Sequence, residues 1–454
     1  MHRETLFGLG RVTSRRTRKP RRAARRSGPR GPRKAWTFIL PLLPILVLSV
    51  VGLLGAGMLS SCNQSTELTV PPLTGQLAPM PTIRVKISPP SSACQVAVNG
   101  AYRIRSQSGA ATSLAALPSC EVTCRGGVWR VGSSAYPGRE IVIEPLAGNF
   151  FCLGPTRYRG TLHLVQQGGD TFVAVNHVDM EGYLAGVLPK ELLTTWSLEA
   201  YKSLAVAART FAYYQSKASG GGRDYDLGDG ESSQVYGGYT AESSTRNARL
   251  AVDATRGMVL AYDGHVFLAQ YSACCGGVVN GAYVIRNTPS DPPLPPLAGG
   301  QACDDCRSCA HYRWGPVRVY KSELYQAIVA RYPQAASLGG VTALNVASQT
   351  PYGRAVWVNV QGPTGQQTRL RAEDIRLCWN MSLTGKPSAS ARRLYSMNCT
   401  IVTNPDSFDF VNGRGFGHGV GLCQWGAQAK AANGWRFNQI LGFYYPGANI
   451  IRAY

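Results

Sequence analysis

The sequence is poor in charge and especially poor in acidic residues. Only 16% of its 454 residues are charged, with 25 Asp and Glu against 47 Lys and Arg, whereas 44% are hydrophobic. This balance excludes a chain that is disordered throughout, and the length is enough to bury a substantial core. The sequence also lacks an internal repeat of fixed period. We therefore expect two domains or one large elaborated domain.

The formal net charge of +22 is unevenly distributed. Residues 1–34 contain 13 Lys or Arg and one Glu, so this stretch supplies +12 and leaves +10 for the rest of the chain. The basic run lacks interleaved aromatic side chains, which argues against the alternative of nucleic-acid binding. We expect residues 1–34 to be a basic cytoplasmic leader next to a membrane segment, with no nucleic acid as partner.

Residues 35–61 contain no charged side chain. These 27 residues are long enough to span a bilayer, which predicts a signal peptide or a transmembrane anchor. The stretch ends in small residues before Cys62, which resembles a lipoprotein processing site with Cys62 as the lipid anchor; an uncleaved signal anchor is the alternative. Residues 62–81 are rich in Pro, Ser and Thr and indicate a flexible tether. The sequence thus predicts an extracytoplasmic, membrane-anchored protein.

Thirteen cysteines are more than a reduced cytosolic enzyme usually contains. Without Cys62, the even number of twelve fits disulfides in an oxidising compartment, although their pairing cannot be deduced. Cys303, Cys306 and Cys309 have CxxCxxC spacing in a Pro- and Gly-rich loop at 288–310, a spacing that alone suggests zinc. We expect disulfides there instead, and assign no metal and no cofactor.

The remaining chain, residues 82–454, predicts an α+β fold of mainly antiparallel strands around a long central helix. Short runs with alternating apolar and polar residues follow one another from 82 to 178 and indicate a β-rich region. The clearest helix covers 197–218, with apolar residues at helical spacing and Ser197 placed to cap its start. A second helix is expected at 322–332.

Glu191 is the strongest candidate for chemistry. It follows Pro189 and an apolar segment and precedes the long helix, which predicts a carboxylate on a strand-to-helix loop, with Trp196 five residues further on. A carboxyl beside apolar groups is disfavoured as an anion, so its pKa rises and it can act as a general acid. A solvated loop residue is the alternative interpretation.

Four blocks of the sequence, in order, resemble the SpoIID and LytB family. They are residues 175–215, 232–267, 269–277 and 413–447. The first block, VNHVDMEGYLAGVLPKELLTTWSLEAYKSLAVAARTFAYYQ, places Glu191 where the family has its proposed catalytic Glu after a Pro. The resemblance extends over roughly residues 82–454 and implies a SpoIID-like catalytic domain.

What the resemblance implies about activity has two forms. Some members of the family are described as lytic transglycosylases, which implies cleavage of the bond between N-acetylmuramic acid and N-acetylglucosamine in peptidoglycan glycan strands, with 1,6-anhydro ends. Related LytB-type proteins are described as amidase modifiers, which implies a non-catalytic wall-binding protein that recruits or stimulates a cell-wall amidase. Some relatives carry a zinc-binding His where this chain has Ser272, so that metal site is not carried over.

Two further groups of residues are predicted to bind substrate. His418 lies among the six glycines of residues 413–426, where backbone can approach a ligand closely, and Gln424 adds an amide. Gln234 and Tyr236 lie on a short segment whose alternate side chains would share one face. A Gly-rich turn with a satisfied histidine and a packed tyrosine-rich strand are the alternatives.

Lys202 and Arg209 are the last pair of candidates. They are seven residues apart on the expected long helix, so they lie on nearly the same face and could bind the lactyl carboxylates of stripped glycan. A solvated helix face is the alternative.

Overall fold

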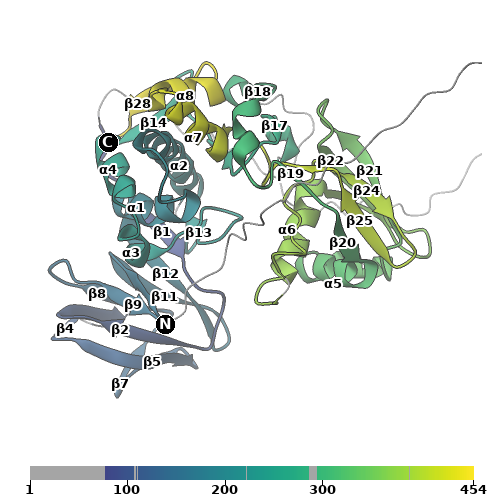
Figure 1. Cartoon of the computed structure of the whole chain (residues 1–454). Helices are drawn as coiled ribbons and strands as arrows, with labels where there is room; N and C mark the ends of the chain where they lie inside the picture. Colours follow the sequence, from purple (N-terminus) through teal and green to yellow (C-terminus); the bar gives the residue numbers. More distant parts are fainter. Residues whose placement is uncertain (1–76, 107–108, 110, 221, 286–293, 388) are drawn as a thin grey trace, which may run out of the picture. The chain divides into compact units, whose positions relative to one another are not determined.

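The computed structural model describes residues 77–106, 109, 111–220, 222–285, 294–387 and 389–454 (Figure 1). The basic leader, the apolar stretch at 35–61, Cys62 and the tether up to residue 76 lie outside these residues. Among the residues that are described, no helix is both long enough and apolar enough to cross a bilayer. The membrane segment and the lipid anchor therefore stay predictions.

Two large sheets account for most of the predicted β-rich region. Their strands are β1 (Thr82–Lys86), β2 (Ala93–Val98), β3 (Tyr102–Ser106), β4 (Thr112–Leu114), β5 (Leu117–Arg125), β6 (Val128–Val131), β7 (Ser134–Pro137), β8 (Glu140–Pro145), β9 (Phe151–Leu153), β10 (Thr156–Tyr158), β11 (Thr161–Gly168), β12 (Thr171–Asp179) and β13 (Leu227–Gly228). The seven-stranded sheet has the order β13-β1-β12-β11-β8-β3-β4, and the six-stranded sheet has the order β10-β9-β2-β5-β6-β7. Neighbours pair antiparallel, apart from the parallel pairing of β1 with β13.

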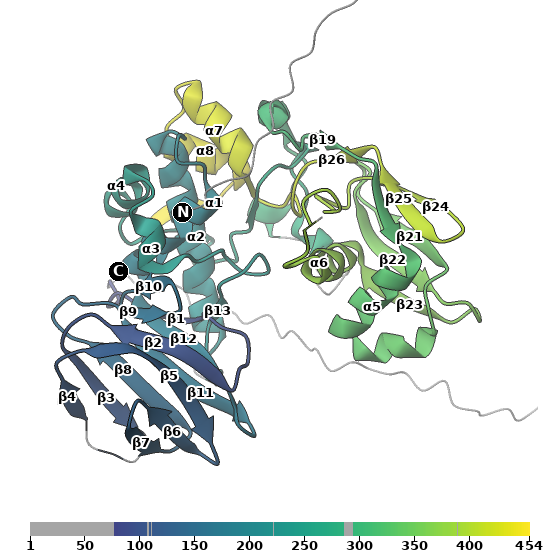
Figure 2. The same ribbon diagram turned by 60° about the horizontal axis from the view of Figure 1, so that its bottom comes forward.

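Both sheets bury one face in the same core, as period-2 alternation requires. In β1, for example, Ile83 and Val85 are buried. Trp129 of the six-stranded sheet meets Phe172 of the seven-stranded sheet edge to face, with ring centroids 5.0 Å apart. The strands of both sheets can be followed in Figure 2. The predicted β-rich region is therefore confirmed.

Helices cover the end of this core. They are α1 (Met180–Glu191), α2 (Leu198–Ala218), α3 (Gly238–Glu242), α4 (Arg246–Ala254), α7 (Gln424–Ala432) and α8 (Phe437–Tyr444). The predicted long helix is α2, and the Ser197 hydroxyl accepts a hydrogen bond from the Ala200 amide at its start. Most of the side chains between Ala200 and Tyr213 are buried, because α2 packs against α1, α4, α7 and α8. It is thus a central helix of the fold.

Short strands join parts of the chain that are distant in sequence. They are β14 (Met258–Tyr262), β15 (His265–Val266), β16 (Tyr271–Ser272), β17 (Gly277–Val278), β18 (Ala302–Cys303), β19 (Arg313–Trp314), β26 (Gly413–Arg414), β27 (Leu422–Cys423) and β28 (Asn449–Arg452). β14 pairs with β15 and β28, β16 pairs in parallel with β27, β17 pairs with β18, and β19 pairs with β26. The C-terminal segments therefore return to the helices that precede residue 262.

A second hydrophobic core lies between Val317 and Phe410, and we call it the insert core. Its elements are β20 (Val317–Tyr320), α5 (Lys321–Arg331), β21 (Ala343–Gln349), β22 (Ala355–Gln361), β23 (Gln367–Arg371), α6 (Ala372–Ser382), β24 (Thr400–Thr403) and β25 (Ser407–Val411). The larger cluster, with buried residues from Ile83 to Ala453, is called the main core. The whole is a strand-rich α+β fold with several antiparallel sheets, as predicted.

Candidate active site

Glu191 is the last residue of helix α1, and this corrects the predicted strand-to-helix loop. Two glycines and Pro189 make the segment a poor helix former, which is why the sequence pattern indicated a loop. Burial overrides that propensity: every residue from Met180 to Leu188 is buried, and the Asp179 side chain caps the helix by accepting from the Gly182 amide at 2.9 Å. The helix end holds Glu191 at the edge of the main core.

Both oxygens of the Glu191 carboxyl accept hydrogen bonds. The Val235 amide donates to Oε1 at 2.9 Å, and Gln424 Nε2 donates to Oε2 at 3.0 Å. Burial raises the pKa of Glu191 above its ordinary value, and the nearby Glu231 raises it further, whereas the bonds from Val235 and Gln424 oppose the rise. The net direction favours a carboxyl that keeps its proton at a higher pH than a solvated glutamate.

A chain of polar side chains lies behind Glu191. The Tyr183 hydroxyl donates to Gln234 Oε1 at 3.0 Å, and Gln234 Nε2 donates to the Tyr271 hydroxyl oxygen at 3.0 Å. Tyr271 in turn hydrogen-bonds to the Glu191 carboxyl. A buried network of this kind fixes side-chain positions, because an unpaired member would be costly. It therefore holds the Glu191 carboxyl in one orientation.

Gln234 and Tyr236 are packed inside the protein, and their role in substrate binding stays a prediction. Both side chains are buried, and Tyr236 donates its hydroxyl to Asn176 Oδ1 at 2.9 Å. The Tyr236 ring packs so closely on Gly186 of α1 that a Cβ there would lie 2.6 Å from it. The segment that was expected to present alternate side chains is loop in the structure, and its side chains turn into the main core instead.

Arg209 is buried in an ion pair, and its predicted contact with substrate stays a prediction. Its side chain is 0% exposed and pairs with Glu181, with Nη2 and Oε2 2.6 Å apart. The Tyr454 hydroxyl donates to Glu181 Oε1 at 2.7 Å, so the pair joins α1, α2 and the C-terminal segment. Lys202, on the same helix, forms an ion pair with Glu199 at 2.8 Å and is partly exposed. Helical spacing did not reveal that the stripe containing Arg209 is buried.

His418 lies in the Gly-rich segment that precedes β27. Its Nδ1 accepts a hydrogen bond from the Val420 amide at 3.1 Å. Burial lowers the pKa of His418 to about 4; Glu373 opposes this shift and Arg354 adds to it. The imidazole is therefore uncharged at neutral pH. Its role in substrate binding stays a prediction.

Trp196 and Trp425 form an aromatic pair beside the ends of α1 and α7. Their rings meet edge to face with centroids 5.1 Å apart. Trp425 follows Gln424 and is partly exposed, so an aromatic surface lies next to the residue that contacts Glu191. Aromatic faces of this kind suit contact with the apolar faces of sugar rings.

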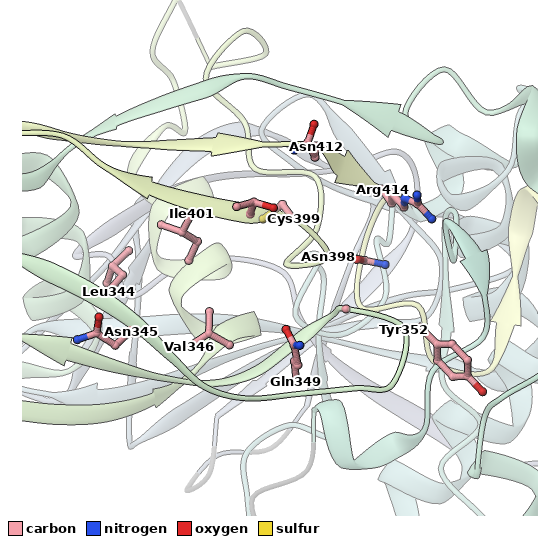
Figure 3. Close-up of a pocket in the computed structure, with 12 residues that line it drawn as sticks. Leu344, Asn345, Val346, Gln349, Tyr352, Asn398, Cys399, Ile401, Asn412 and Arg414 are labelled. Carbon is pink, nitrogen blue, oxygen red and sulfur yellow. The ribbon is translucent and has the colours of Figure 1, made fainter. Parts of the chain in front are cut away.

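A cavity of about 670 Å³ lies elsewhere, between the edge strands β21 and β24 of the insert. Figure 3 shows its lining side chains, among them Asn345, Gln349, Asn398 and Arg414. None of the predicted site residues lines it. The chemistry proposed for Glu191 therefore does not use this cavity.

The cysteines differ from the expectation of disulfides. All twelve cysteines within the described ranges have free thiols. Cys303, Cys306 and Cys309 are buried in the main core, together with Cys274, Cys275 and Cys423. The Cys-rich loop thus contributes to the core instead of being pinned at the surface by disulfides.

Sequence reasoning found Glu191 and Gln424 but missed the groups that orient them. The Val235 amide and Tyr271 carry no sequence signal of their own, since the first is backbone and the second lies 80 residues from Glu191 in the chain. Glu181, ten residues before Glu191, was read as part of a motif, and the structure makes it the partner of Arg209. An acidic residue within an apolar helix was the available hint.

The fold and this site together define an α+β protein with one hydrogen-bonded carboxyl of raised pKa beside aromatic rings, an arrangement suited to general acid–base chemistry. Residues 168–262 match the SpoIID family, described as Stage II sporulation protein, and residues 301–421 match a domain of unknown function (DUF8618). Together with the curated relatives that follow, these matches support the resemblance to the SpoIID family that the sequence blocks predicted.

Curated proteins show the same relationship. An uncharacterized protein of Brachyspira hyodysenteriae is 29% identical over 311 residues, which is 68% of this chain and 76% of the relative. The amidase enhancer of Bacillus subtilis is 28% identical over 300 residues, covering 59% of this chain but only 40% of the enhancer. Stage II sporulation protein D of the same organism is 25% identical over 293 residues, covering 62% and 76% respectively.

Proposed function

We propose that the protein is a lytic transglycosylase of the cell wall, anchored to the membrane at its N-terminus and facing away from the cytoplasm. The observation that carries the proposal is the Glu191 carboxyl, which is fixed by Val235, Gln424 and Tyr271 and has a raised pKa. The SpoIID match and the relatives named for sporulation and for amidase enhancement support a role at peptidoglycan.

One carboxyl is enough for this reaction. Protonated Glu191 donates its proton to the glycosidic oxygen as the bond from muramic C1 to that oxygen breaks. The resulting carboxylate then takes the proton of the muramic C6 hydroxyl as this oxygen attacks C1, which closes the 1,6-anhydro ring. Water is not consumed, so the second carboxylate of ordinary glycosidases is not needed. Val235 and Gln424 hold the carboxylate that exists between the two proton transfers.

Mass spectrometry of soluble products tests this proposal. Full-length protein in detergent is incubated with amidase-stripped glycan strands, and wild type is compared with Glu191→Gln. We expect anhydro-muramic ends from wild type and about a 10²- to 10⁴-fold lower rate from the variant, the usual contribution of general acid–base catalysis. Glu323→Gln, in helix α5 of the insert, is the matched control and should cleave like wild type. Full activity of a folded Glu191→Gln would contradict the proposal, and reducing ends would indicate hydrolysis.

A second candidate function is favoured by one relative. The amidase enhancer of Bacillus subtilis matches 59% of this chain, so a non-catalytic wall-binding role that stimulates a cell-wall amidase is the alternative. It predicts binding to purified sacculi without new glycan ends, and faster release of stem peptides only when an amidase is added. Failure to bind sacculi would exclude it.

A further inference from the structure

Four buried cysteine thiols meet at one point of the main core. Their sulfur atoms all lie within 4.8 Å of one another, and each residue is at most 1% exposed. We propose that this is a binding site for one zinc ion, coordinated by the thiolates of Cys275, Cys303, Cys306 and Cys423. The inference stands apart from the proposed activity, because it concerns only the binding of the ion.

Backbone pairing brings these cysteines together. In the parallel pair of β16 and β27, Ser272 lies opposite Cys423, and Cys275 follows three residues later. In the antiparallel pair of β17 and β18, Gly277 lies opposite Cys303. Cys306 is in the short 3-10 helix η3 (Asp304–Ser308) that continues directly from β18. The ligands therefore come from three separate segments held in register by main-chain hydrogen bonds.

The distances fit a tetrahedral ion better than the alternatives. Cys275 Sγ and Cys306 Sγ are 3.6 Å apart. Four ligands at the usual Zn–S distance of about 2.3 Å are separated by roughly 3.8 Å at tetrahedral angles, whereas a disulfide requires about 2.05 Å. An iron–sulfur cluster must fit its own irons and sulfides between the cysteines, for which this spacing leaves too little room. A closed set of four thiolates is typical of structural zinc.

Hydrogen-bonding groups lie beside two of the thiols. The Cys275 amide donates to Cys423 Sγ at 3.3 Å, and the Tyr444 hydroxyl lies 3.1 Å from Cys303 Sγ. Donors of this kind orient and stabilise metal-bound thiolates. Gly426 makes room for the arrangement, because a Cβ there would lie 2.1 Å from Tyr444 Oη and 2.7 Å from Cys303 Sγ.

Cys309 offers a sharp internal control. It completes the CxxCxxC spacing with Cys303 and Cys306, yet its thiol is outside the group of four and interacts with Cys274. A site chosen by local spacing would contain Cys309. The site chosen by geometry contains Cys275 and Cys423 in its place.

Metal content tests the proposal. The full-length protein is purified from membranes in detergent without added reductant, and metals are measured by inductively coupled plasma mass spectrometry while thiols are mapped by alkylation. We expect about one zinc per chain and four thiols that become reactive only when the protein is denatured and chelated. Absence of zinc, iron in its place, or a disulfide between any two of the four cysteines would overturn the proposal.

Cobalt substitution and variants test the ligand set. Protein loaded with Co²⁺ should show the thiolate charge-transfer and visible bands of a tetrahedral four-sulfur site, which wild type alone can reveal even if a variant fails to fold. Cys306→Ser and Cys423→Ser should lose the ion, whereas Cys309→Ser and the insert-core control Cys378→Ser should keep it. Loss of zinc from Cys309→Ser, or its full retention by folded Cys306→Ser, would overturn the assignment.

Discussion

The main core and the insert core differ in how far apart in sequence their buried ion-pair partners lie. In the main core, Glu181 pairs with Arg209 of the next long helix and also accepts from Tyr454, 273 residues away. In the insert core, Glu373 pairs with Arg376 three residues later on the same helix. The first pair joins distant segments and the second is local. For these two pairs, the main core depends on long-range closure of the chain, whereas the insert uses a local contact.

The candidate active site follows the same division. Glu191 belongs to the part of the chain before the insert, whereas Gln424, its hydrogen-bond donor, comes after it. The cavity between β21 and β24 lies within the insert and contains neither residue. The site is thus assembled by the same long-range closure that assembles the main core.

Breaking the long-range ion pair should give the largest loss of stability. Arg209→Met leaves Glu181 buried without its partner, which should lower the free energy of unfolding by about 3–5 kcal/mol. Arg318→Met, which removes the surface pair with Asp409 in the insert, should leave it nearly unchanged, since that pair is solvated. Urea unfolding followed by circular dichroism measures both. Equal losses in the two variants would show that the Glu181–Arg209 pair contributes no more than a solvated surface pair.

A cavity created by mutation in either core should destabilise mainly that core. Leu204 and Leu324 are both fully buried, the first in the main core and the second in the insert core. Each Leu→Ala change should cost about 2–5 kcal/mol in its own core. In hydrogen exchange, Leu324→Ala should accelerate residues 317–410 and spare α2, whereas Leu204→Ala should accelerate α2. Faster exchange of α2 in Leu324→Ala would instead indicate one cooperative unit.

Removing the hydrogen bond from Gln424 to Glu191 should have a smaller effect, which appears in the pH dependence of the activity. The Gln424 amide favours the ionised form of Glu191, so Gln424→Leu should raise the pKa of Glu191 further. Because a general acid acts in its protonated form, the alkaline limb of kcat/KM for anhydro-end formation should move to higher pH. Gln349→Leu, in the insert cavity, should leave the pH profile unchanged. A lower rate with no shift of the limb would show that Gln424 does not tune this pKa.

Local periodicity predicted the strands and α2, because their own sequences show the alternation of a strand or the apolar spacing and N-cap of a helix. Alternation located β1, β8 and β12, and Ser197 marked the start of the long helix. Helix α1 was not predicted, because two glycines and Pro189 lower its helix propensity. The burial of residues 180–188 stabilises the helix in spite of that low propensity. Such burial depends on packing partners that the segment itself does not specify.

Single residues of the candidate site could be predicted from the sequence, but the contacts between them could not. Glu191 and Gln424 were both named, but their contact spans 233 residues and has no local pattern. Arg209 looked like a surface residue because helical spacing gives a face without saying what covers it. Among the cysteines, spacing singled out Cys309, whereas strand pairing selects Cys275 and Cys423.

The parallel pairing of β16 with β27 has a consequence for how this chain can vary. Tyr271 and Leu422 lie side by side, so residues 272–421, which contain the insert core, leave and re-enter the rest of the fold at neighbouring points. A segment with adjacent ends can be lengthened, exchanged or removed without stretching its host. Cys275, Cys303 and Cys306 lie within that segment and Cys423 lies just beyond it, so the proposed zinc ion would tie the segment to the rest of the main core.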